Sequence, residues 1–149
     1  SKADINTHIG DGRAVLAAQL KSAGSQQFDV LAVDAFSGDA IPVHLLTQEA
    51  FELYWQHLNN DGVLAIHITN RHLDLSSVLR QLARRFNKQA VHIIDIGDDY
   101  TDPNDWVLIT DNQQFLDFLH QAGVVRKWRR DAEPIFWTDD FSNLFDVVR

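Results

Sequence analysis

The sequence predicts an α/β fold in which helices flank a mostly parallel β-sheet, and two observations carry this prediction. Short, nearly continuous apolar runs rich in β-branched residues recur along the chain, as is typical of strands buried on both faces. Between them lie segments whose apolar residues recur at three- and four-residue intervals, as in amphipathic helices. Strands that alternate with helices form βαβ units with parallel strands, and such sheets bind ligands outside the carboxyl ends of their strands.

The first part of the chain is expected to contain two strands and two helices. We expect a strand over Ile5–Ile9, a helix over Arg13–Lys21 and a strand over Phe28–Asp34. Thr47 is placed to cap the next helix, because its side-chain oxygen can accept a hydrogen bond from the first turn. The turn-forming residues 59–62 are expected to end that helix, whose apolar stripe consists of Phe51, Tyr54, Trp55 and Leu58.

The middle of the chain is expected to contain three strands and a helix. The apolar runs predict strands over Gly62–Ile68, Ala90–Ile96 and Trp106–Ile109. The helix is expected between the first two of these strands. Asp74 is its expected N-cap, and its apolar stripe consists of Leu75, Val78, Leu79, Leu82 and Phe86.

The chain is expected to close with a helix and a packed tail. The polar run Asp111–Gln114 resembles a capping box, and Gly123 is a typical helix end. The apolar residues between them are Phe115, Phe118, Leu119 and Ala122. The closing segment Trp137–Leu144 is polar and aromatic, so we expect it to pack against the body of the domain.

Composition excludes several classes of function. The chain has 149 residues, of which 45% are hydrophobic and 23% charged, the proportions of one globular domain. It has no cysteine, which excludes disulfides, cysteine-ligated zinc, iron–sulfur clusters and thiol nucleophiles. The net charge of -8 argues against nucleic acid or anionic lipid as partner, but it suits cationic small molecules.

No sequence signal points to a membrane or to a metal ion. No apolar run approaches the roughly 20 residues of a membrane span, and the start of the chain has no apolar signal region. We therefore expect a cytoplasmic domain without direct membrane contact. The seven histidines form no H-E-x-x-H or comparable motif, so no metal site is predicted. His67 and His92 lie inside predicted strands and are interpreted as core residues rather than ligands.

The segment Gly10–Val15 allows two interpretations. It follows one predicted strand and opens a helix, as does the G-x-G-x-x-G loop that holds a pyrophosphate. Asp34 then stands roughly where the ribose-binding acid of such folds lies, about 20 residues further on. Val15, however, replaces the third glycine, so the motif is incomplete. The segment is either a minimal dinucleotide site or a tight turn that binds nothing.

The segment after Phe28–Asp34 carries the most chemical information. The predicted buried strand delivers Asp34 to the ligand-binding edge of the sheet, and the following loop supplies a second carboxylate, Asp39. Two carboxylates in one loop can hold an amine and accept its proton. The alternative is that Asp34 caps a helix or accepts hydrogen bonds from loop amides. Ser37 has no G-x-S-x-G surroundings, which argues against a serine hydrolase.

These residues resemble a known family. The segment Phe28–Thr47 is similar to the central motif of spermidine synthase-like proteins, and so are Glu49–Phe51 and Asp61–Gly62 after it. The segment Gly10–Ala14 resembles the one that follows the third strand of that fold. The closing Trp137–Leu144 resembles the end of bacterial members, some of which are fused to membrane-spanning segments.

The resemblance implies a partial Rossmann-like fold of the S-adenosylmethionine-dependent methyltransferase type and a role in polyamine biosynthesis. The reaction is transfer of an aminopropyl group from decarboxylated S-adenosylmethionine, a co-substrate rather than a tightly bound cofactor, to putrescine or a related amine. The implied roles are as follows: Asp34 takes the proton from the attacking amine, Asp39 helps to hold the diamine, and Asp11 with Gly12 meets the adenine.

The chain departs from the family pattern in two ways, and the first implies that residues 1–149 are the carboxyl-terminal part of a longer catalytic domain. The glycine-rich donor-binding turn and the acidic residue that holds the donor ribose are absent, and the D-S-S-D motif is longer here, from Asp34 to Asp39. The chain alone is therefore expected to be inactive. The alternatives are a catalytically silent domain that binds a nucleoside or a partner, and a minimal NAD-binding domain.

The absence of the donor-binding part also leads to a prediction about the edge of the sheet. Without its usual neighbour, the strand Phe28–Asp34 would expose an unpaired apolar edge, which is a liability for a soluble domain. We expect either that Ile5–Ile9 covers this edge or that two copies of the chain pair along it as a homodimer.

Overall fold

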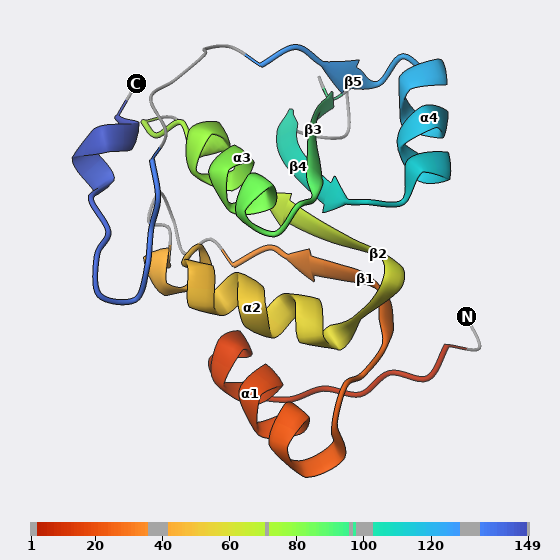
Figure 1. Ribbon diagram of the computed structural model, residues 1–149, viewed down its shortest axis with the longest axis vertical. Coiled ribbons are helices and arrows are strands. Elements are labelled where there is room, and N and C mark those ends of the chain that lie inside the picture. The colour runs from red at the N-terminus through yellow and green to blue at the C-terminus, as the bar shows by residue number, and fades with distance from the viewer. Residues whose placement is uncertain are drawn as a thin grey trace.

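The computed structural model describes residues 3–35, 42–70, 72–95, 97, 103–128 and 135–148. The elements appear in Figure 1. In chain order they are α1 (Gly12–Ala23), β1 (Phe28–Val33), η1 (Val43–Leu45), α2 (Gln48–His57), β2 (Leu58–His67), α3 (Ser76–Arg85), β3 (Gln89–Asp95), β4 (Asn104–Thr110), α4 (Gln113–Gln121), β5 (Val125–Arg126) and η2 (Leu144–Val147), where η is a 3₁₀-helix.

The α/β class is confirmed, but the expected mostly parallel sheet is wrong. The five strands lie in the order β1-β2-β4-β3-β5. Only β1 and β2 pair in parallel in the described residues, whereas β4 is antiparallel to both β2 and β3, and β5 is antiparallel to β3. The reason lies in the connection from β3 to β4. A parallel crossover needs about a dozen residues or more, so a connection as short as 96–103 brings the chain back antiparallel.

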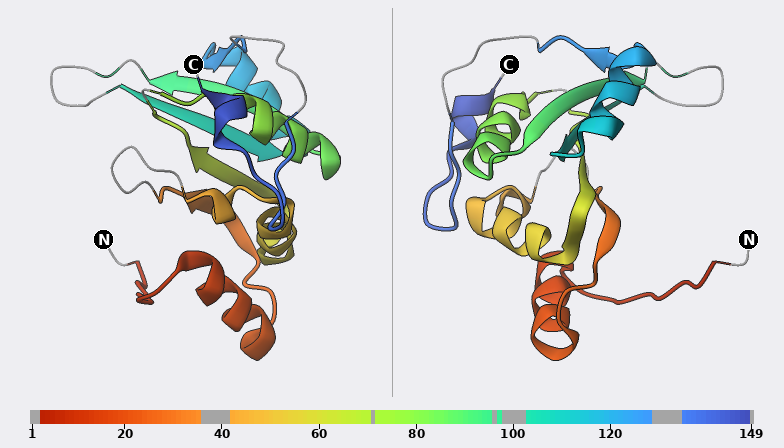
Figure 2. Two further views of the ribbon diagram at one scale, coloured as in Figure 1. Left: turned by 90° about the vertical axis from the view of Figure 1, so that its left-hand side faces the viewer. Right: turned by 45° about the vertical axis from the view of Figure 1, so that its right-hand side comes forward.

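Helices cover both faces of the sheet (Figures 1 and 2). The main core lies between the sheet and α2 and α3, and its fully buried residues include Phe51, Leu79, Leu64 and Ile109. A smaller core forms under α4, where Leu116 and Leu119 meet Val91 of β3. The stripe of α4 thus packs on the face opposite to α3. In the described part of the chain, no helix combines the length and the apolar character needed to cross a bilayer.

The expected helix caps are largely confirmed. Thr47 accepts a hydrogen bond from the Ala50 amide at the start of α2, and Asn112 does the same for the Phe115 amide at the start of α4. Asp74 accepts from the Ser76 amide just before α3, although the formal N-cap position is Leu75. These side chains satisfy amides that have no partner within their own helix.

The expected turn at 59–62 is wrong, because β2 begins at Leu58, directly after α2. Gly62 allows this path. A Cβ on Gly62 would lie 2.9 Å from the Leu58 side chain and 3.0 Å from the Phe28 carbonyl oxygen. The close approach of β1 and the start of β2 therefore requires glycine at this position.

The strand expected over Ile5–Ile9 is absent. Residues 3–9 form no strand, and β1 is the edge strand of the sheet (Figure 2). The side chains of Ile5 and Ile9 are 83% and 100% exposed, with polar residues between them. In a strand, Ile5 and Ile9 would share one face with the polar Thr7 between them, so that face offers little apolar surface to bury. The prediction that Ile5–Ile9 covers the edge of β1 is therefore wrong. The alternative, that two copies of the chain pair along β1, stays a prediction.

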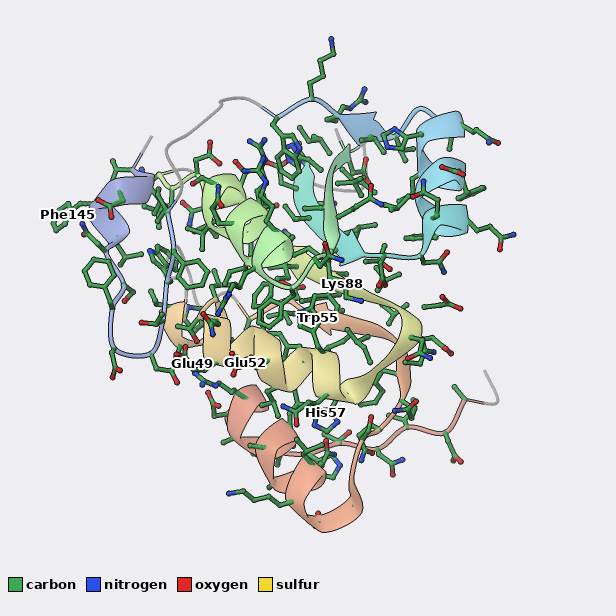
Figure 3. All side chains as sticks on the ribbon, viewed as in Figure 1. Glu49, Glu52, Trp55, His57, Lys88 and Phe145 are labelled. Carbon is green, nitrogen blue, oxygen red and sulfur yellow. The ribbon has the colours of Figure 1, made fainter. Side chains whose placement is uncertain are left out.

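The carboxyl-terminal segment packs against the body, as expected. Trp137 is completely buried in the main core, and Val147 is 2% exposed. The Gln48 amide donates a hydrogen bond to the Trp137 carbonyl, and the Asp74 amide donates to the Val147 carbonyl. The outer side of this segment is apolar, with Phe145 87% exposed (Figure 3).

Candidate functional site

A cavity of about 700 Å³ lies against α1 and β1. Its volume falls within the range of small-molecule sites. Asn6 and His8 line it from the segment before α1, and Leu45 and Tyr54 line it from η1 and α2. Further lining residues come from α1 and from β1 with its end: Gly12, Arg13, Leu16, Phe28, Leu31, Val33, Asp34 and Ala35. The wall is mostly apolar, with a carboxylate at the carboxyl end of β1.

Asp34 lies at the carboxyl end of β1, the edge of the sheet where the sequence leads us to expect a ligand. It follows the last residue of β1, lines the cavity, and its side chain is 58% exposed. It caps none of the helices that the structure describes, and its Oδ1 is 2.7 Å from Nδ1 of His67. In the described part of the chain, no hydrogen bond reaches its other oxygen, Oδ2. A partly exposed carboxylate with one held and one open oxygen is suited to receive a proton or a cationic ligand.

The interpretation of His67 as a core residue is wrong. His67 ends β2 at the same sheet edge as Asp34, and its side chain is 21% exposed. Because β1 and β2 are parallel and Val33 pairs with Ile66, the next residues of the two strands meet side by side. The sequence signal was weak, because Asp34 ends its apolar run whereas His67 stands one residue before the end of its own run, at Ile68. The interpretation of His92 holds: it is 4% exposed and lies 3.4 Å from the Asp105 carboxylate.

Asp11 and Gly12 form the start of α1, and only Gly12 is among the lining residues of the cavity. Asp11 is the N-cap: its Oδ1 accepts from the Ala14 amide, and its Oδ2 is 2.8 Å from Nε2 of His44. The Ala14 hydrogen bond, helped by His44, lowers the pKa of Asp11. A Cβ on Gly12 would meet nothing within 4 Å, so this part of the wall is open.

The dinucleotide interpretation of Gly10–Val15 loses its structural context. The phosphate-binding loop needs a strand before the glycines, and residues 3–9 form none. Asp34 does follow the next strand, β1, but the strand before the glycines is missing. The segment is a capped helix start rather than a strand-to-helix phosphate loop.

Asp39 lies outside the described residues, as does Ser37. The structure therefore brings together two of the four predicted site residues, Gly12 and Asp34, on one cavity, and places Asp11 beside Gly12.

Sequence reasoning missed a polar network beside the cavity, centred on Arg13. The Arg13 guanidinium donates two hydrogen bonds to the Asp139 carboxylate, at 2.7 and 2.6 Å, and a third to the His44 carbonyl. Thr47 donates to Asp139 Oδ1 at 2.7 Å, and Glu49 accepts from the Asp139 amide. The carboxyl-terminal segment is thereby fastened to the starts of α1 and α2. The sequence gives only a weak indication of this network, because its residues lie far apart along the chain.

Tyr54 lies beneath this network and lines the cavity. It is 1% exposed, and its hydroxyl donates a hydrogen bond to the Leu45 carbonyl at 3.1 Å. Burial raises the pKa of Tyr54, so it stays a neutral donor. Figure 3 shows Glu49 on the same helix, near its first turn, and His57 at its far end, next to α1.

Replacing Asp139 by asparagine is expected to lower the free energy of unfolding by about 1 kcal/mol at pH 7, because the bidentate pair is partly solvent-exposed. The hydrogen bond from Arg13 lowers the pKa of Asp139 below its ordinary 3.8. The carboxylate therefore stabilises the fold above pH 3.8, and this contribution is lost as the pH falls through the lowered pKa. Urea unfolding at several pH values measures the difference, which should shrink below pH 3.8.

The matched control is the exposed neighbour Asp140, whose replacement by asparagine should change stability by less than about 0.5 kcal/mol at every pH. An Asp139→Asn difference that stays constant down to acid pH would contradict the role of the Arg13 pair.

Comparison with known proteins finds similarity in sequence to a curated protein and in structure to several solved chains, one of which is described below. No protein-family model matches the chain. The probable polyamine aminopropyl transferase of Bifidobacterium longum (strain NCC 2705) is 36% identical over 66 residues, which cover 44% of this chain and 14% of that protein. Spermidine synthase from Thermotoga maritima matches 89% of this chain and 43% of its own, with a TM-score of 0.48 and 14% identity. Over 44% of its length, this chain is thus similar in sequence to a protein described as a probable polyamine aminopropyl transferase.

Proposed function

We propose that this chain forms part of an aminopropyl transferase that moves an aminopropyl group from decarboxylated S-adenosylmethionine to putrescine or a related amine. The single observation that carries the proposal is Asp34, a carboxylate that lines an otherwise largely apolar cavity at the carboxyl end of β1. The similarity to an aminopropyl transferase supports the choice of reaction. The chain spans 14% of that relative's length, so the proposed activity belongs to a longer protein.

The reaction needs a base because the acceptor amine is protonated at neutral pH. An alkyl amine has a pKa of about 10.4, as in lysine, so freeing it at pH 7 costs roughly 4–5 kcal/mol. In the proposed step, Asp34 Oδ2 takes a proton from the ammonium group. The amine lone pair then forms a bond to the aminopropyl carbon beside the sulfonium, and the carbon–sulfur bond breaks. The electron pair goes to sulfur, and methylthioadenosine leaves as a neutral thioether.

The other proposed contacts involve the start of α1 and, from the sequence, the loop after β1. Gly12 leaves room for the donor at the start of α1. Asp11 adjoins it, and each carboxylate oxygen can accept a second hydrogen bond, so Asp11 can still receive an adenine amino group. We propose that Asp39 helps to hold the second amine of the diamine, since a second carboxylate suits a dication.

The test is release of methylthioadenosine by the longer protein, supplied with decarboxylated S-adenosylmethionine and putrescine. We expect release that depends on the amine. No release with putrescine, spermidine or cadaverine would overturn the proposal. In parallel, the 149-residue chain is titrated with methylthioadenosine. We expect weak or no binding and no turnover, and turnover by this chain alone would overturn its proposed inactivity.

A further inference from the structure

We propose that His67 is the positioning residue of Asp34: it donates an N–H from Nδ1 to Asp34 Oδ1 and so leaves Oδ2 to face the reaction. The catalytic consequence rests on the proposed function, whereas the proton position on His67 does not. Sequence reasoning places His67 in the core, and the described structure places it at the site.

The hydrogen-bond partners of His67 determine which nitrogen carries the proton. An ionised carboxylate only accepts hydrogen bonds, so the 2.7 Å contact between Asp34 Oδ1 and Nδ1 requires a proton on Nδ1. On the other side of the ring, Nε2 lies 2.6 Å from the Thr69 hydroxyl. That hydroxyl accepts from the Asp105 amide at 2.8 Å and has its own proton left to donate to Nε2. The chain Asp105–Thr69–His67–Asp34 thus runs in one direction, from a backbone amide to the carboxylate.

Packing holds the imidazole ring in the plane that this contact needs. The His67 ring stacks on Trp106 of β4, with centroids 4.9 Å apart and the planes inclined by 26°. Trp106 pairs directly with His67 across the antiparallel β2–β4 ladder. The ring is therefore supported by the strand on one side of β2, and the carboxylate comes from the strand on the other side.

The consequence concerns the orientation of the base. A free aspartate side chain can present either oxygen, whereas a carboxylate with Oδ1 held by His67 presents Oδ2. A group held in its productive geometry reacts faster than one that must find it. Loss of His67 should therefore lower kcat more than it raises KM for the amine, because substrate binding does not use this contact.

The first experiment needs no activity. Long-range ¹H–¹⁵N spectra of the histidine rings, recorded on the 149-residue chain at neutral pH, report which ring nitrogens carry protons. We expect a proton on Nδ1 of His67. A His67 that is protonated only on Nε2 would overturn the proposal, even if the longer protein is an active transferase.

The second experiment separates the donor from the ring. His67→Phe keeps a ring to stack on Trp106 but has no N–H, while His67→Asn keeps a short amide donor but no ring. In the longer protein we expect His67→Phe to lower kcat roughly 10- to 100-fold with KM within about threefold, and His67→Asn to retain most of kcat. His120→Phe, an exposed histidine on α4, should leave both unchanged.

The outcomes are distinguishable. Wild-type kcat in His67→Phe, or equal losses in His67→Phe and His67→Asn, would overturn the positioning role while leaving the proposed function intact. An inactive wild-type protein would overturn the proposed function, and the ring spectra would still decide the proton position on His67.

Discussion

Replacing Asp34 by asparagine is expected to lower kcat for methylthioadenosine release roughly 10²- to 10⁴-fold, the range for loss of a general base. Asparagine has nearly the same shape, and its Oδ1 can still accept the hydrogen bond from His67. Its amide cannot take a proton from the amine. The change therefore removes the base and preserves its position, so KM for the amine should change little. Steady-state turnover of the longer protein with putrescine gives both constants.

The control for this variant is Asp29→Asn. Asp29 lies on the same strand, β1, but is not among the residues that line the cavity. Its replacement should leave turnover within about twofold of the wild type. Unchanged turnover in Asp34→Asn would remove Asp34 as the base. A rise in KM without a fall in kcat would assign it to amine binding instead.

Replacing Trp137 by alanine is expected to lower the free energy of unfolding by about 3–5 kcal/mol, the usual cost of truncating a buried aromatic residue. The Trp137 side chain is completely buried, and it packs among residues of α2, α3, β2 and β4. The alanine variant leaves a large void in this core. It also loosens the segment that carries Asp139 to Arg13. Urea unfolding followed by circular dichroism measures the loss.

The matched variant is Trp137→Phe. In the described structure, the buried Trp137 Nε1 has no hydrogen-bond partner, so phenylalanine removes no hydrogen bond while it keeps most of the ring. We expect a loss of about 1–2 kcal/mol. A Trp137→Ala loss below about 1 kcal/mol would show that the closing segment does not depend on this anchor.

The local elements follow from the sequence because their causes are local. The caps of α2 and α4, Thr47 and Asn112, bond to amides three residues further along the chain. The apolar runs give β1 to β4 to within a few residues, because strand burial requires them. The failures at Ile5–Ile9 and at 59–62 are also instructive. Ile5 and Ile9 form no strand and lie exposed to solvent. Residues 59–62 form no turn, because Gly62 lets β2 approach β1 closely at this point.

The sequence predicts the position of each candidate site residue within its own strand or helix, but not which of these residues meet. The place of Asp34 follows from the end of a buried strand, and that of Gly12 from the start of a helix. That both line one cavity depends on the packing of α1 against α2, which leaves the cavity between α1 and β1. The antiparallel entry of β4 between β2 and β3 brings Trp106 against His67, and no periodicity along the chain indicates it.

Local chemistry thus accounts for the helices, the strands, the acidic character and the position of Asp34 at a strand end. Long-range packing accounts for the contacts at the site, namely the hydrogen bond between His67 and Asp34 and the ion pair between Arg13 and Asp139. The physical reason is range. Caps and apolar periodicity act over three or four residues, whereas these contacts join residues 33 and 126 positions apart, and only the assembled sheet and core bring them together.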